Sequence, residues 1–249
     1  MRRRLMISRH CCSAQASHSD MNSLRTLAID WPGLPDRVRV LSTLRSGGVS
    51  ASPYDDGAGG GGLNLAMHVG DVPEAVATNR ELLCALLPSG PAWLTQVHGT
   101  AVVTAQHVAS QSHHDAPRAD ASITTQSGVV CAIMTADCMP VLFADREGRA
   151  VGAAHAGWRG LAGGVLENTV RSLRQAGARQ LLAWLGPAIG PVHFEVGEEV
   201  LAAFDRLGPA ARLAFRPVMG KAGKYLADLA ALARLALADI GVTDVAGGT

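Results

Sequence analysis

The stretch T-A-D-C-M-P-V-L-F-A-D-R-E-G-R-A-V-G-A-A-H-A-G-W-R-G (135–160) contains two short apolar runs joined by a charged turn. The runs V-L-F-A (141–144) and A-V-G-A-A-H (150–155) have the length and composition of buried strands, so the stretch predicts a hairpin. Cys138 and His155 stand at the ends of these runs. They are either ordinary residues of a hairpin core or half of a reaction centre.

Outside this hairpin, strands and helices follow one another without a regular β-α-β order. Further strands are predicted at 37–44, 92–97, 101–105, 121–125, 129–135 and 181–186, and helices at about 73–87, 161–176, 196–204 and 226–240. The segment D-D-G-A-G-G-G-G (55–62) is predicted to be a flexible loop, and it is not a P-loop because no Gly-Lys-Ser/Thr follows it. The mixture predicts an α+β fold with more than one sheet layer.

The composition is that of a globular protein. Hydrophobic residues make up 48% and charged residues 17% of the 249 positions, which excludes a largely disordered chain. The formal net charge of +1 shows no excess of basic residues of the kind that binds phosphate backbones, so nucleic acid is not expected as a partner. No apolar run reaches the ~20 residues of a membrane helix. The odd number of cysteines without a C-x-x-C motif favours free thiols in a reducing cytoplasm.

The first twenty residues differ from the rest of the sequence. They are rich in Arg and Ser and poor in acidic residues, like a transit peptide, and they lack the apolar segment of a secretory signal. We favour a non-folding extension at 1–20, with Met21 as an alternative start. Residues 21–249 are then expected to form a single domain.

Three residues suited to metal binding stand at the ends of predicted strands. They are His98 in T-Q-V-H-G-T, Cys138 in A-D-C-M-P and His155 in A-A-H-A-G-W-R-G. A thiolate and two imidazoles form a three-ligand zinc set with a fourth position left for water, the arrangement of catalytic zinc. Asp137 is a candidate acceptor or proton carrier behind the ligands. Taken singly, each His or Cys is more often an ordinary surface or core residue, so pattern alone leaves both interpretations open.

Two arginines suit an anionic ligand. Arg45 precedes S-G-G-V-S, where a glycine backbone can approach a ligand closely. Arg159 lies between Gly157 and Gly160 at the expected start of a helix, where free N–H groups favour anions. A surface ion pair is the alternative for Arg159. Trp158 suits stacking on a base, or covering of the core.

Five motifs together resemble one known family. They are L-N-L-A-M-H-V-G-D, T-Q-V-H-G-T, A-D-C-M-P-V-L-F-A-D, A-A-H-A-G-W-R-G-L-A-G-G-V and G-P-A-I-G-P-V-H-F-E-V-G-E-E-V. The chain resembles the bacterial laccase-domain family, also called the YfiH family, whose members are now usually described as purine nucleoside phosphorylases. The likeness runs in the same order from about Arg37 to about Val245.

The resemblance implies a fold, a metal and a set of site residues. The fold would be a four-layer α/β/β/α sandwich of mixed sheets, shared with certain cysteine-hydrolase-like toxins. The family's His-Cys-His metal triad falls on His98, Cys138 and His155, with zinc as the expected metal and copper as the alternative. With purine nucleosides and phosphate as ligands, the expected substrate-binding residues are Arg45, Asn64, Gln96, Asp137, Trp158 and Arg159. A monomer or a homodimer is expected.

The activity that the resemblance implies is a zinc-dependent purine nucleoside phosphorylase with adenosine deaminase activity. Its substrates would be adenosine, inosine, guanosine and methylthioadenosine. Three alternatives remain. They are a copper-dependent polyphenol oxidase, an amidase that edits cytoplasmic peptidoglycan precursors with Cys138 as nucleophile and His155 as base, and a non-catalytic member that only binds nucleosides.

The sequence departs from the family pattern in two places. The motif G-P-C-I-G-P-C reads G-P-A-I-G-P-V here, with Ala188 and Val192 in place of the two thiols. The family usually continues past the glycines at 247–248 with a Cys-Thr step and an aromatic Ser-Tyr-Arg-Arg segment, whereas this sequence stops at Thr249. We expect the shorter end to leave a sheet edge open and to remove a ligand-binding arginine.

Overall fold

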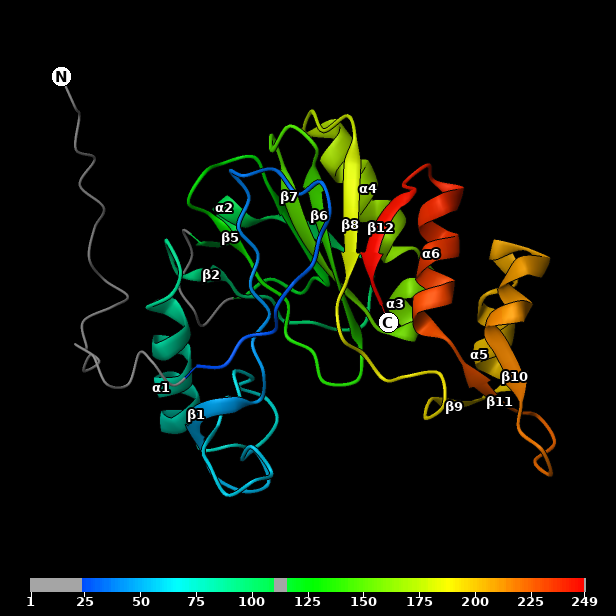
Figure 1. Ribbon diagram of the computed structural model, residues 1–249, viewed down its shortest axis with the longest axis horizontal. Coiled ribbons are helices and arrows are strands. Elements are labelled where there is room, and N and C mark those ends of the chain that lie inside the picture. Colours follow the sequence, from blue (N-terminus) through cyan, green and yellow to red (C-terminus); the bar gives the residue numbers. More distant parts are fainter. Residues whose placement is uncertain (1–23, 110–115, 249) are drawn as a thin grey trace. The chain divides into compact units, whose positions relative to one another are not determined.

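The computed structural model of the protein describes residues 24–109 and 116–248, and the predicted extension at 1–20 lies outside them. The described residues cluster into two compact units. The first contains residues 24–28 and 41–90, and the second contains residues 29–40, 91–109 and 116–248. Figure 1 shows their helices and strands. That residues 21–249 form a single domain stays a prediction.

The first unit is built around strand β1 (Ser46–Ser50) and helix α1 (Pro73–Cys84), which pack together. Proline at the first helical position and Glu74 in the first turn both favour a helix start. The predicted helix at 73–87 is therefore confirmed, although its α-helical part ends at Cys84. Asn79 is completely buried on this helix, and its amide donates to Ser50 Oγ at 2.9 Å.

The strand predicted at 37–44 is wrong. In the part of the chain that the structure describes, Thr43 forms an isolated bridge with Thr26, and the strand follows at β1 instead. A Cβ on Gly48 of β1 would lie 2.3 Å from the Gly62 carbonyl oxygen and 2.4 Å from Asn79 Oδ1. The two glycine segments thus approach each other closely, which only glycine allows. Strand propensity favoured the wrong segment because this contact is not local.

The second unit contains a mixed six-stranded sheet. Its strands are β3 (Val102–Thr104), β4 (Ala121–Thr124), β6 (Met139–Asp145), β7 (Val151–Ala156), β8 (Leu181–Leu185) and β12 (Asp244–Gly247), in the order β12-β8-β6-β7-β4-β3. The outer pairs β12/β8 and β3/β4 are parallel, and the inner pairs are antiparallel. The predicted hairpin is confirmed as β6–β7 at the centre of the sheet (Figure 1).

Smaller elements complete the second unit. They are the parallel pair β2 (Pro91–Ala92) and β5 (Val130–Cys131), the antiparallel sheet of β9 (Glu195–Gly197), β10 (Phe215–Pro217) and β11 (Lys224–Ala227), the helices α2 (Ala105–Ala109), α3 (Trp158–Gly163), α4 (Val165–Gln175), α5 (Glu198–Ala203) and α6 (Leu229–Asp239), and the 3-10 helices η3 (Asp205–Leu207) and η4 (Pro209–Ala214). The predicted α+β class with more than one sheet, the largest of them mixed, is therefore confirmed. The strand predicted at 129–135 shortens to Val130–Cys131, whereas the strand predicted at 92–97 is wrong, because β2 ends at Ala92 and the chain continues to His98 as a loop.

The single helix predicted at 161–176 is two helices. Gly164 has a left-handed backbone with φ 98°, and it ends α3 and caps the start of α4. The apolar stripe of α4 includes Val165, Val170 and Leu173, which are buried. This face packs against β7 and β4, so the predicted stripe is correct although the helix boundary was not.

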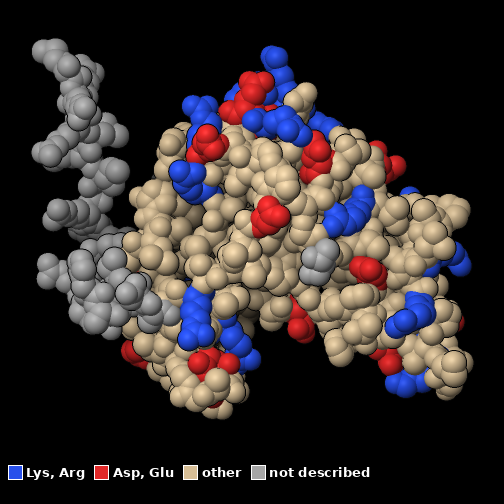
Figure 2. Space-filling view, viewed as in Figure 1, with Lys and Arg blue, Asp and Glu red and all other residues tan. Residues whose placement is uncertain are grey.

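The surface carries charges of both signs. On the face seen in Figure 2, Lys and Arg are interspersed with Asp and Glu, as expected for a formal net charge of +1. Across the residues with described structure, no helix combines the length and the apolar character that crossing a lipid bilayer requires.

A buried carboxylate holds the turn between β6 and β7. Asp145 has no exposed surface and accepts hydrogen bonds from Arg149 Nε at 2.7 Å and from the Arg179 backbone N–H at 2.9 Å. Burial alone would raise the pKa of Asp145, but these hydrogen bonds outweigh it and hold the pKa well below its usual value of 3.8.

Asp145→Asn is expected to lower the free energy of unfolding at pH 7 by about 3 kcal/mol, because it leaves buried donors without their charged acceptor. A depressed folded-state pKa stabilises the fold above the unfolded-state value near 3.8, and this stabilisation is lost as the pH falls. The difference in the free energy of unfolding between wild type and Asp145→Asn should therefore become smaller below about pH 4. Urea unfolding of both proteins at several pH values measures this difference. A difference that stays constant down to about pH 2.5 would contradict a lowered pKa of Asp145 in the folded protein.

Candidate metal centre

His98, Cys138 and His155 lie together in the second unit. One ligand atom from each lies within 4.8 Å of the other two. Cys138 Sγ is 3.7 Å from His98 Nε2, and the two imidazole rings meet edge to face with centroids 4.7 Å apart. Among the described residues, this is the one group of three or more His, Cys, Asp or Glu side chains that could hold a metal ion.

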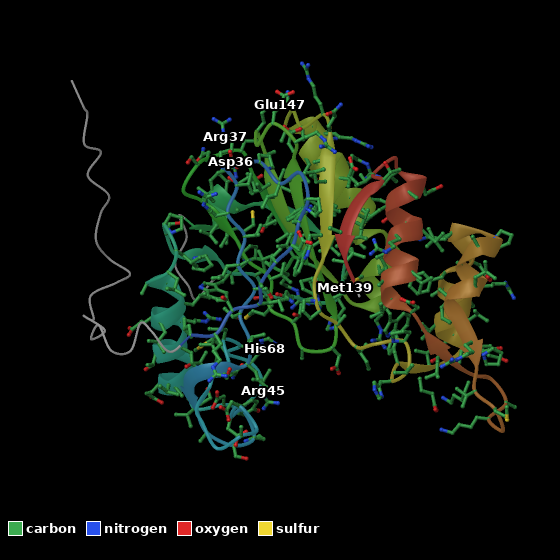
Figure 3. The ribbon with its side chains drawn as sticks, viewed as in Figure 1. Asp36, Arg37, Arg45, His68, Met139 and Glu147 are labelled. Atoms are coloured by element: carbon green, nitrogen blue, oxygen red, sulfur yellow. The ribbon has the colours of Figure 1, made fainter. Side chains whose placement is uncertain are left out.

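The central hairpin places two of these residues. Met139 pairs with Ala156 and Pro140 with His155, so Cys138 just before β6 faces Gly157 just after β7. A Cβ on Gly157 would lie 2.8 Å from Cys138 Sγ and 3.0 Å from His98 Cδ2. The glycine after A-A-H-A is therefore needed for the close approach of the backbone to two of the three candidate ligands. Met139, which follows Cys138 and begins β6, is labelled in Figure 3 and marks this end of the hairpin.

Gly157→Ala is expected to push the ligands apart, because the added methyl group would overlap Cys138 Sγ. We expect metal affinity to fall at least about tenfold and the free energy of unfolding to fall by about 1–3 kcal/mol. Titration with zinc and urea unfolding measure the two effects. Gly190→Ala is the matched control, since a Cβ there meets nothing within 4 Å. Equal metal affinity in both variants would refute the close approach.

Asp120 lies behind both histidines and was missed in the sequence. It is completely buried, directly before β4. Its carboxylate is 2.8 Å from His155 Nδ1 and also accepts the backbone N–H groups of Val97, His98 and Gly99. The only local signal was an acid between two alanines at the start of a buried strand. Asp137, the acceptor that the sequence suggested, is exposed, and its role stays a prediction.

His98 has an unusual backbone. Its φ of 58° is left-handed, and within residues 24–109 and 116–248 it is the only residue other than glycine with a positive φ. Such a conformation costs free energy in a residue with a side chain and persists only where surrounding contacts hold it. Here the Asp120 carboxylate accepts the N–H of His98 at 2.9 Å and that of Gly99 at 2.7 Å.

The protein environment sets the protonation of the cluster. Burial raises the pKa of the Cys138 thiol, and the negative charges of Asp137 and Asp120 raise it further. Burial lowers the pKa of His155, opposed by the hydrogen bond to Asp120 and reinforced by nearby His98. His155 is therefore neutral at pH 7. Hydrogen bonds hold the pKa of Asp120 below its usual value despite burial, so its carboxylate is ionised and can only accept. This contact favours the tautomer with the proton on Nδ1 and the Nε2 lone pair available to a metal.

The remaining predicted site residues of the second unit have protein partners. Gln96 donates to the Met134 carbonyl at 2.7 Å and accepts the Met134 N–H at 2.8 Å, so its amide ties two segments together. Trp158 begins α3 and is half-buried. The exposed Arg159 places its guanidinium carbon 4.4 Å from the centroid of the Trp158 ring, a cation–π contact.

Arg45 and Asn64 belong to the first unit. Arg45 donates through Nε to the Asp55 carbonyl at 3.0 Å and lies 3.8 Å from the Asp55 carboxylate. Asn64 donates to Asp71 Oδ2 at 2.9 Å and accepts the Ala66 N–H at 3.0 Å. Figure 3 labels Arg45 and His68 in this part of the chain. A role in substrate binding stays a prediction for both Arg45 and Asn64.

A family model described as multi-copper polyphenol oxidoreductase laccase matches residues 39–249. The chain belongs to this family. The laccase-domain resemblance seen in the five motifs is thereby confirmed.

Curated relatives in this laccase-like family carry another name. The chain is 52% identical over 222 residues to a purine nucleoside phosphorylase of Pseudomonas aeruginosa, covering 89% of this chain and 86% of the relative. It is 50% identical over 222 residues to purine nucleoside phosphorylase YfiH of Escherichia coli, covering 88% of this chain and 84% of the relative.

Solved structures of the laccase-like family share the fold. A Neisseria meningitidis protein of the DUF152 family superposes with a TM-score of 0.80 at 47% identity, covering 91% of this chain and 87% of that one. YlmD from Geobacillus stearothermophilus superposes with a TM-score of 0.76 at 30% identity, covering 90% and 87% of the two chains.

Proposed function

We propose that this protein is a metal-dependent purine nucleoside phosphorylase whose metal is held by His98, Cys138 and His155. The observation that carries the proposal is the convergence of one sulfur and two imidazole nitrogens within 4.8 Å. It occurs in a chain about half identical to relatives named purine nucleoside phosphorylase. The expected substrates are adenosine, inosine, guanosine and methylthioadenosine, and adenosine deamination is the expected second activity.

The donor set fits zinc. One thiolate and two neutral imidazoles are common zinc ligands, and three protein ligands leave a fourth position open. Cys138 directly precedes β6 and His155 lies near the end of β7, so the paired strands keep both rigid. His98 lies in the loop between β2 and β3, where the buried Asp120 carboxylate accepts its backbone N–H. A zinc ion held here would act as a Lewis acid with one exchangeable position. Within residues 24–109 and 116–248, the one three-residue cluster suits a single ion and does not support the several coppers of a laccase. A single copper is the alternative metal.

The chain's own residues supply binding groups for the nucleoside and the phosphate. In phosphorolysis a phosphate oxygen forms a bond to C1′ while the glycosidic C–N bond breaks, giving a free base and ribose 1-phosphate. The exposed guanidinium of Arg159 suits the phosphate, and the ring of Trp158 suits stacking on the purine. Arg45, Asn64, Gln96 and Asp137 are the further proposed contacts.

An amidase with Cys138 as nucleophile is less well supported. Such a nucleophile reacts as a thiolate, and reactive cysteines have electropositive surroundings that lower the thiol pKa. Here burial, Asp137 and Asp120 raise the pKa of Cys138, so the protein groups alone keep the thiol neutral. The contact of 3.7 Å between Cys138 and His98 is equally suited to two ligands of one ion.

Incubation of purified protein with adenosine, with and without phosphate, tests the proposed function. We expect adenine and ribose 1-phosphate only when phosphate is present, and a smaller release of ammonia from deamination. Three results would each overturn the proposal. They are no conversion of any nucleoside over long incubation, oxygen consumption with a phenol as the sole activity, or a covalent adduct at Cys138 that forms with a peptidoglycan precursor without metal.

A further inference from the structure

One carboxylate contacts both histidines of the metal centre. Asp120 Oδ1 lies 2.8 Å from His155 Nδ1 and accepts the His98 N–H at 2.9 Å. Oδ2 accepts the Gly99 N–H at 2.7 Å, and both oxygens lie 3.2 Å from the Val97 nitrogen. Four N–H groups thus converge on a carboxylate with no exposed surface.

The sheet fixes this carboxylate relative to His155. Ala121 of β4 pairs with Ala154 of β7, and the His155 N–H donates to the Asp120 backbone carbonyl at 2.7 Å. Asp120 and His155 are therefore neighbours across two paired strands, and the hydrogen bond between their side chains repeats the contact of their backbones.

We propose that Asp120 is the positioning residue of this centre. It fixes the tautomer of His155 and the left-handed backbone of His98, so that both imidazoles face Cys138 before a metal arrives. The proposal rests on the proposed function insofar as the cluster is taken to bind a metal. It adds the group that organises the ligands. Among the described residues, Asp120 is the one side chain seen to contact both the His98 backbone and the His155 ring.

The chemistry of the contacts requires a carboxylate at this position. A carboxylate has two acceptor oxygens and no donor, which matches four converging N–H groups. Asparagine has nearly the same size as aspartate, but its NH₂ group is a donor and would face some of the converging N–H groups. Asp120→Asn therefore loses part of this set of hydrogen bonds. Groups behind metal ligands typically change metal affinity by about 10–100-fold.

Zinc affinity of the Asp120→Asn protein, measured by competition with a chromophoric chelator, tests the proposal. We expect binding about 10–100-fold weaker than in wild type, and altered absorption bands when cobalt replaces zinc. Asp145→Asn is the matched control, because Asp145 is another completely buried aspartate that accepts backbone N–H groups but contacts no ligand. It should bind zinc as wild type does. Equal affinity of wild type and Asp120→Asn would overturn the proposal.

The tautomer of His155 provides a second test that needs no variant. Nitrogen-15 NMR of the metal-free wild type should show His155 protonated at Nδ1 and bare at Nε2, and the reverse tautomer would overturn the proposal. This measurement tests the role of Asp120 even if Asp120→Asn does not fold. It also separates two failures. Wild type that binds no zinc refutes the proposed metal centre, whereas wild type and variant that bind zinc equally refute only the role of Asp120.

Discussion

Cys138→Ala is expected to lose the bound metal and with it the phosphate-dependent cleavage of adenosine. The substitution removes the only sulfur of the cluster and leaves two imidazoles, which is too few ligands for a stable zinc site. The loss of turnover should exceed the roughly 10–100-fold that changes behind metal ligands produce. Metal analysis and nucleoside assays on the same preparation measure both effects.

Cys131→Ala is the matched control for this variant. Cys131 lies on β5 beside an apolar cluster, and burial raises the pKa of its thiol to about 11. It is therefore an inert thiol, and its loss should leave metal content and turnover unchanged. Adenosine conversion that survives in Cys138→Ala at the wild-type rate would refute the metal centre as the site of the reaction.

Phe143→Ala is expected to lower the free energy of unfolding by about 3–5 kcal/mol. Phe143 is 1% exposed, and it lies in the middle of β6, which pairs with both β7 and β8. Its truncation leaves a cavity at the centre of the sheet that holds Cys138 and His155. Urea unfolding measures the change, with Leu213→Ala as control because Leu213 is 89% exposed. A loss below about 1 kcal/mol would mean that the centre of the sheet is not well packed.

The central hairpin and the cluster could be predicted because their signals are local. Two apolar runs around D-R-E-G indicated the hairpin, and it forms as β6–β7. The residue types of His98, Cys138 and His155 and their positions at the ends of predicted strands suggested one ligand set. The structure brings their ligand atoms together, although His98 lies in a loop rather than at the end of a strand. The period of apolar residues in α4 likewise identified its buried face.

Features that depend on distant contacts could not be predicted. β1 forms at S-G-G-V-S because the backbone of Gly62 lies against Gly48, and no propensity reveals that contact. Asp120 was missed because its importance arises from N–H groups more than twenty residues away in sequence. The break at Gly164 requires a left-handed backbone between two helices, whereas a single glycine in an apolar stripe is also tolerated within one helix.

The two names carried by the family imply different chemistry. A multi-copper oxidoreductase needs several metal sites, whereas the described part of this chain contains one group of three ligands. His68 and His193, the other histidines in the family motifs, are exposed and belong to no such group. The geometry therefore favours a single metal ion. This agrees better with the name purine nucleoside phosphorylase of the curated relatives than with a multi-copper oxidoreductase.

X-ray absorption at the zinc edge, on protein purified without added metal, tests the metal centre most directly. We predict one zinc ion per chain with one sulfur and two nitrogen ligands from the protein, and loss of the sulfur signal in Cys138→Ala. Protein that is active on nucleosides but holds no zinc, or holds it without sulfur, would contradict a centre built from His98, Cys138 and His155.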